Sequence, residues 1–118
     1  MSTYGAPPII EWMGANAPDR AAVLEDIREL ATTAAPALEH VERTLTDGYA
    51  CALAVETELL RLRRRLEDRA AVLGNGSGAA VREVTGLAQR VAEADEELAE
   101  LRGALTGLAS IAQRLRAA

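Results

Sequence analysis

The sequence predicts an all-α fold: an antiparallel coiled-coil hairpin with a short N-terminal helix packed at its open end, as in a three-helix bundle. Three observations predict it. The 118 residues include 25 Ala, 16 Leu and 13 Arg but no Phe and no Lys, a composition typical of long helices. Two long stretches repeat apolar residues with a seven-residue period. The Gly- and Ser-rich residues 74–78 separate those stretches as a turn.

The N-terminal part divides into an irregular segment, residues 1–17, and the start of a single helical domain, residues 18–118. Prolines and glycines interrupt the first segment, which disfavours regular structure there. A first helix is expected over 18–34, with Asn16 or Ala17 close to its N-cap. Apolar residues at helical spacing predict its buried face. The main ones are Val23, Leu24, Ile27 and Leu30.

Pro36 predicts a break after this helix, because proline removes a backbone donor and clashes with the preceding turn. The second and third helices are expected over 36–73 and 79–116. The a and d positions of the second helix are Leu38, Val41, Leu45, Gly48, Ala52, Val55, Leu59, Leu62, Leu66, Arg69 and Leu73. Those of the third are Ala80, Val84, Leu87, Val91, Ala94, Leu98, Leu101, Leu105, Leu108, Ala112 and Leu115.

The short turn requires antiparallel helices and fixes which layers face each other. Gly48 is then opposite Leu105, and in general small residues face large ones, as constant helix spacing requires. The flanking charges are alike at the closest levels, where Glu56 is near Asp95, Glu58 near Glu97 and Arg65 near Arg90, but one heptad further along they predict four complementary ion pairs between the helices. These are Arg63–Asp95, Glu56–Arg102, Glu58–Arg90 and Arg65–Glu83. A dimer that exchanges helices across the Gly-rich turn is an alternative arrangement.

The g positions of both long helices change character along the hairpin. They are charged near the turn but become Thr44, Cys51, Ala104 and Ile111 at the open end. Gly103 and Gly107 lie beside this strip, where a neighbouring backbone could approach closely. Since glycine inside a helix costs about 1 kcal/mol relative to alanine, we expect the first helix to pack there.

The overall charge and apolar patterning exclude several classes of protein. A net charge of −5 argues against general nucleic-acid binding. No stretch is apolar enough to span a membrane and no signal peptide is recognised, so a cytoplasmic location is expected. A single cysteine excludes a disulfide framework. The use of Arg in place of Lys indicates a GC-rich, bacterial genome.

Catalytic and metal chemistry find little support in the sequence. His40 is the only histidine and falls at an outer heptad position, and Cys51 is best interpreted as a small buried residue. The acidic cluster around Asp95 spreads around its helix, which favours solvation over metal binding. No nucleotide-binding or nucleophile motif is present. We therefore expect a non-enzymatic protein without a cofactor.

Two surface features are candidate binding sites. Arg61, Arg64 and Arg65 form the densest cationic cluster, and their guanidinium groups suit a phosphate or a cyclic dinucleotide. The N-terminal segment concentrates large apolar side chains, a composition typical of a partner-docking motif. The candidate partner contacts are Ile10, Trp12, Met13, Gly103 and Gly107.

Trp12-Met13-Gly14 is similar to the Trp-x-Gly triplet of the WXG100 family, small helical-hairpin proteins exported by type VII secretion. That family carries the triplet in the turn between its helices, whereas the turn predicted here is residues 74–78. The family's C-terminal tyrosine–acid export signal is missing. A secreted helical hairpin of this kind is one functional hypothesis that the resemblance implies.

The first hypothesis for function is a helical interaction protein, an adaptor, scaffold or regulator, that self-associates and binds a helical protein partner through its coiled-coil surfaces. The second is a regulatory coiled coil that senses a small anionic ligand or nucleotide through the Arg cluster. The WXG100-like secreted protein is the third.

Overall fold

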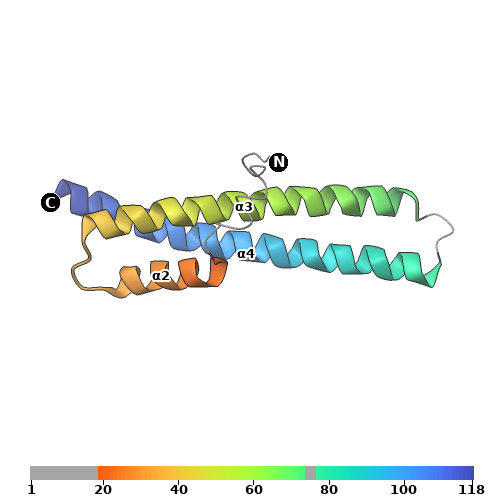
Figure 1. Ribbon diagram of the computed structural model, residues 1–118, viewed down its shortest axis with the longest axis horizontal. Helices are drawn as coiled ribbons and strands as arrows, with labels where there is room; N and C mark the ends of the chain where they lie inside the picture. Colours follow the sequence, from red (N-terminus) through yellow and green to blue (C-terminus); the bar gives the residue numbers. More distant parts are fainter. Residues whose placement is uncertain (1–18, 74–76) are drawn as a thin grey trace, which may run out of the picture.

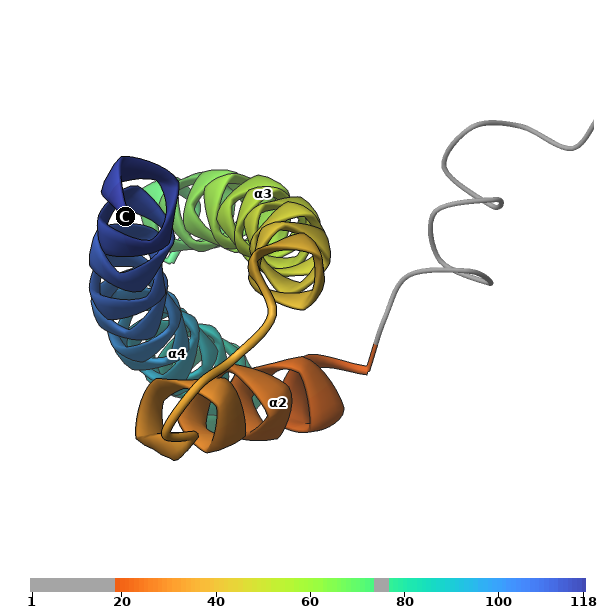
Figure 2. The same cartoon turned by 90° about the vertical axis from the view of Figure 1, so that its left-hand side faces the viewer.

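The computed structural model describes residues 19–73 and 77–118, which form an all-α structure of three helices. They are α2 (Arg20–Thr32), α3 (Leu38–Ala71) and α4 (Gly78–Ala117). Figure 1 shows α3 and α4 side by side and antiparallel, with α2 along the half that is remote from their turn. Seen end on, α2 lies against one side of the α3–α4 pair (Figure 2). The predicted hairpin with a short third helix at its open end is confirmed.

The helix boundaries follow from local chemistry. Asp19 caps α2, since its carboxylate accepts a hydrogen bond from the backbone N–H of Ala21 at 3.1 Å. The cap is therefore not Asn16 or Ala17, which lie outside the described residues. Residues 33–37 are not helical, as Pro36 predicted. At the start of α4 the Ser77 side chain accepts a hydrogen bond from the N–H of Ala80 at 3.3 Å.

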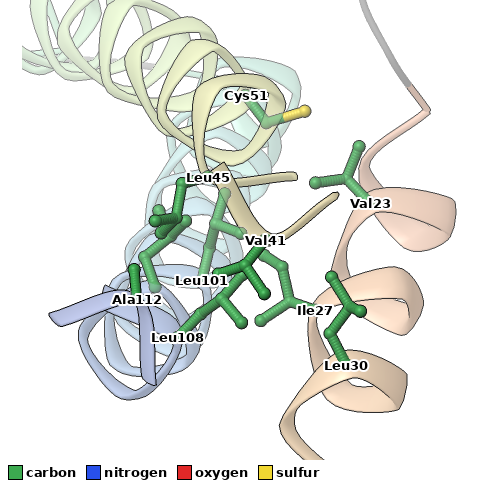
Figure 3. Close-up of a cluster of buried hydrophobic side chains, with 10 residues drawn as sticks. Val23, Ile27, Leu30, Val41, Leu45, Cys51, Leu101, Leu108 and Ala112 are labelled. Atoms are coloured by element: carbon green, nitrogen blue, oxygen red, sulfur yellow. The ribbon is translucent and has the colours of Figure 1, made fainter. Parts of the chain in front are cut away.

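Two buried clusters form the core. The first lies at the open end, where all three helices contribute and α2 presents its predicted face (Figure 3). It contains Val23, Ile27, Leu30, Val41, Leu45, Cys51, Leu101, Leu105, Leu108 and Ala112. The second lies between α3 and α4 alone. It contains Val55, Leu59, Leu62, Leu87, Ala94 and Leu98. The molecule is thus a three-helix bundle at one end and a two-helix hairpin at the other.

The predicted register of the hairpin is confirmed at Gly48. A methyl group at this position would overlap the Leu105 side chain, so the two residues are in close contact across the helices. Two predicted ion pairs are also present: Arg63 contacts Asp95 at 2.8 Å, and Arg102 contacts Glu56.

The other two predicted ion pairs are wrong. Glu58 binds Arg20 of α2, and Glu83 lies 3.6 Å from Arg69. Arg69 occupies a core d position in the heptad, but its side chain reaches solvent near the turn, where it comes within range of Glu83. The prediction considered the two long helices only, and it missed the cation that α2 supplies.

The expected packing of α2 against Gly103 and Gly107 is wrong. A methyl group at either glycine would meet nothing within 4 Å. Both occupy outward positions of the α4 heptad, while α2 lies over the g positions, where Thr44 and Cys51 are buried. The glycine that permits close packing is Gly48, where a methyl group would also lie 3.2 Å from the Ile27 Cδ1 atom.

Candidate interaction surface

The side of the hairpin that α2 covers is held by charge as well as by apolar contact. Arg20 donates hydrogen bonds to Glu97 at 2.8 Å and to Glu58 at 3.1 Å. Partial burial lowers the pKa of the Arg20 guanidinium, but the two carboxylates outweigh this effect and the pKa is raised above its ordinary value. Further along α2, Arg28 contacts Glu100 at 2.6 Å. The start of α2 is therefore clamped to both long helices, and its C-terminal half is clamped to α4.

This Arg20 clamp was missed by sequence reasoning, although a signal for it exists. Glu58 and Glu97 occupy facing g positions, and two facing carboxylates repel each other unless a cation lies between them. An arginine at the start of the preceding helix is such a cation. Finding it required knowing that the start of α2 reaches the middle of the hairpin.

Replacing Arg20 by alanine is expected to loosen α2. The variant leaves Glu58 and Glu97 facing each other without a cation, and we expect a loss on the order of 1 kcal/mol, because these pairs are partly solvated. Urea unfolding and the rate of Cys51 modification by a thiol reagent measure the change. Arg82→Ala is the matched control, since the exposed Arg82 makes no ion pair within the described residues. Equal values for the two variants would contradict the clamp.

Cys51 is a structural thiol beneath α2. Its side chain is 2% exposed, and Figure 3 shows its sulfur on the side of α2, close to Val23. Burial raises the pKa of the Cys51 thiol, and the nearby carboxylates of Asp47 and Asp19 add to the increase, while Arg20 opposes it. The predicted small buried residue is confirmed, and its reaction with reagents requires α2 to open.

The raised pKa of Cys51 predicts a loss of stability at alkaline pH. The folded state binds the thiol proton more tightly than the unfolded state does, so the contribution is fully present below the ordinary thiol pKa of 9.0 and is lost as pH rises through the raised value. We expect the urea midpoint of the wild type to fall between pH 8 and pH 10.5 by more than that of Cys51→Ala. An equal fall of the urea midpoint in the wild type and in Cys51→Ala would show that the thiol is protonated to the same extent in the folded and the unfolded state.

The described residues hold no metal-binding group, and the predicted arginine cluster lies on the surface of α3. His40 is exposed, and residues 19–73 and 77–118 contain no group of three His, Cys, Asp or Glu that could hold a metal ion. Arg61, Arg64 and Arg65 are exposed on α3 and make no ion pair within those ranges. A hollow of about 330 Å³ lies nearby, but none of the three lines it. It is lined by Arg20, Glu58, Leu62, Arg90, Glu93, Ala94 and Glu97.

The opposite side of the hairpin carries a groove of about 380 Å³, called here the uncovered groove. It is lined by Tyr49, Ala52, Leu53, Glu56, Arg102, Leu105 and Thr106. Tyr49 and Leu53 form its α3 edge and are 53% and 56% exposed. The two charged residues of its lining, Arg102 and Glu56, form an ion pair with each other. The groove is therefore mostly apolar, and its charged side chains are paired.

The sequence-based candidates lie around this groove only in part. Gly103 and Gly107 are exposed on α4, on either side of Thr106 along the chain. Ile10, Trp12 and Met13 lie outside the described residues. Sequence reasoning missed Tyr49 and Leu53. The signal for them was two large apolar residues at the outward e and b positions of the heptad, one turn apart.

Comparison of the chain with protein families, with curated proteins and with solved structures gave no match. Within the described ranges no helix has the length and apolar character needed to cross a membrane.

Proposed function

We propose that this protein is a non-enzymatic helical interaction protein, an adaptor, scaffold or regulator that binds another helix through the uncovered groove. The observation that carries the proposal is the exposure of Tyr49 and Leu53 beside an apolar groove whose two charged residues, Glu56 and Arg102, pair with each other. Exposed apolar side chains at a concave helical surface are typical of helix-in-groove recognition.

The side of the hairpin opposite the uncovered groove already binds a helix in this way, because α2 packs there. There, α2 fills the groove with Val23, Ile27 and Leu30, which are four and three residues apart. An amphipathic helix with the same spacing would bury Tyr49 and Leu53 in an equivalent way. Because Glu56 is already paired with Arg102, such a helix needs apolar contact more than it needs charge.

Photo-crosslinking in the producing cell tests the proposal. A photoreactive phenylalanine analogue replaces Tyr49 in one variant and Glu29, on the exposed face of α2, in the control variant. We expect a protein crosslink from position 49 and none from position 29. Mass spectrometry of the crosslinked product identifies the bound chain. A lack of any protein crosslink from position 49 would contradict the proposed function.

A thermal-shift titration with nucleotides and inorganic phosphate distinguishes the alternative function, an anion sensor, from the proposed interaction protein. The interaction proposal expects no stabilisation, because the exposed Arg61, Arg64 and Arg65 line neither hollow. Stabilisation by a nucleotide that is lost in Arg61→Ala and Arg64→Ala would favour the sensor.

A further inference from the structure

The side of α3 next to the uncovered groove carries large apolar residues that no part of residues 19–73 or 77–118 covers. Tyr49, Leu53 and Leu60 are 53%, 56% and 61% exposed. They occupy e and b positions of the heptad, so they form one ridge along the same side of the helix. Burying such side chains is favourable by about 25 cal/mol per Å² of apolar surface.

The neighbouring side of α4 is made of small residues at the same levels. Since Gly48 lies opposite Leu105, Tyr49 is level with the stretch around Gly103 and Thr106. By the same register Leu53 is within one residue of the level of Ala99, and Leu60 of the level of Ala92. All four of these α4 residues are exposed, and the space over Gly103 is open to at least 4 Å. The face thus combines a ridge on one helix with a furrow on the other.

We propose that the occupant of the uncovered groove is a second copy of this chain, related by a two-fold axis parallel to the helices. This deepens the proposed function and rests on it. Such an axis sets α3 of each copy against α4 of the other, antiparallel and at the same level. The ridge of each chain then enters the furrow of its partner, a self-complementary contact of the kind that two-fold dimers require.

Charge supports the same arrangement. Within one chain Arg63 reaches Asp95, 32 residues further on, at 2.8 Å. Arg64 directly follows Arg63 in the chain, and Glu96 directly follows Asp95. Neither Arg64 nor Glu96 makes an ion pair within residues 19–73 and 77–118. They lie at outer f positions, which flank the dimer contact on the same side. Because α3 and the partner's α4 are antiparallel, Arg64 is then seven residues, about 10 Å, from the level of Glu96, two residues more than separate Arg63 from Asp95 within one chain, and the two oppositely charged side chains extend toward each other along that flank.

A two-fold axis perpendicular to the helices is a different dimer. It would place α3 against α3, so that the ridges of the two copies collide and the furrows on α4 stay empty. Size complementarity therefore selects the parallel axis.

Solution mass tests the dimer. Light scattering is expected to give twice the 12.5 kDa of one chain for the wild type and the monomer mass for Leu53→Glu. Helix content should stay unchanged, because Leu53 is exposed within the chain. Val72→Glu is the matched control on a residue that is 77% exposed near the turn, and it should remain dimeric.

Charge reversal tests the pairing of Arg64 with Glu96. Arg64→Glu should weaken the dimer, and adding Glu96→Arg should restore it.

Cysteine pairing tests the arrangement. In a Cys51→Ala background, chains with Tyr49→Cys and chains with Gly103→Cys are mixed and oxidised. A disulfide between the two kinds of chain, without disulfides between chains of the same kind, is expected. Disulfides within the Tyr49→Cys population would place α3 against α3 and overturn the arrangement.

The two proposals fail separately. A wild-type mass of 12.5 kDa at all concentrations overturns the homodimer. A crosslink from position 49 to a different protein would then leave the proposed function standing with another occupant. A monomer without any crosslink from position 49 would overturn both.

Discussion

Replacing Ile27 by alanine is expected to destabilise the open end by about 3 kcal/mol, the usual range for a fully buried Ile in a packed core being about 2–5 kcal/mol. Ile27 has no exposed surface and lies at the centre of the face that α2 presents to both long helices. An isolated helix of 13 residues is marginal in water, so α2 should unfold once it leaves the hairpin.

The readout for Ile27→Ala distinguishes release of α2 from global unfolding. Cys51 should become reactive toward a thiol reagent while α3 and α4 keep most of the helical circular dichroism, because the second core cluster contains no α2 residue. Val72→Ala removes the same kind of apolar surface from an exposed position and should leave both readouts unchanged. An Ile27→Ala variant with a protected Cys51 and an unchanged urea midpoint would show that α2 contributes little to the bundle.

Replacing Gly48 by leucine is expected to destabilise the protein by about 2–3 kcal/mol, within the range measured for overpacked cores. Even the first carbon of a new side chain would overlap Leu105 and would lie 3.2 Å from the Ile27 Cδ1 atom. Both neighbours are themselves buried, so the new side chain must push α2 or α4 away. Urea unfolding measures the loss.

Two further variants test whether the effect of Gly48→Leu comes from the contact with Leu105. Gly107→Leu introduces the same side chain where nothing lies within 4 Å, and its better helix propensity should stabilise the protein by several tenths of a kcal/mol. Combining Gly48→Leu with Leu105→Ala should recover part of the loss, since the second change makes room for the first. Equal effects of leucine at positions 48 and 107 would contradict the packing described for α2.

Much of the fold could be predicted because the sequence is locally consistent. The break at Pro36, the turn after Leu73 and two uninterrupted heptad patterns specify three helices and their order. The short turn then fixes the register, and that alignment sets small residues such as Gly48 against large ones such as Leu105. The ion pair between Arg63 and Asp95 followed from the same register.

The candidate site was less predictable, because outward positions of a heptad carry no constraint from the hairpin seam. Gly103 and Gly107 suggested close packing, yet a glycine can equally lie under open space, as both do. Tyr49 and Leu53 were unremarkable as single surface residues, and they form a groove only together with Leu105 and Thr106 of the other helix.

The sequence alone determined which residues are helical and which faces of the two long helices meet, because heptad periodicity is a one-dimensional property of each helix. The tertiary structure decided how far α2 extends along the hairpin, that Arg20 bridges Glu58 and Glu97, and which side of the hairpin α2 leaves uncovered. Those features depend on the reach of side chains between elements that are distant in the chain. The distances between these side chains are fixed only once α2 is placed on one of the two sides of the α3–α4 hairpin.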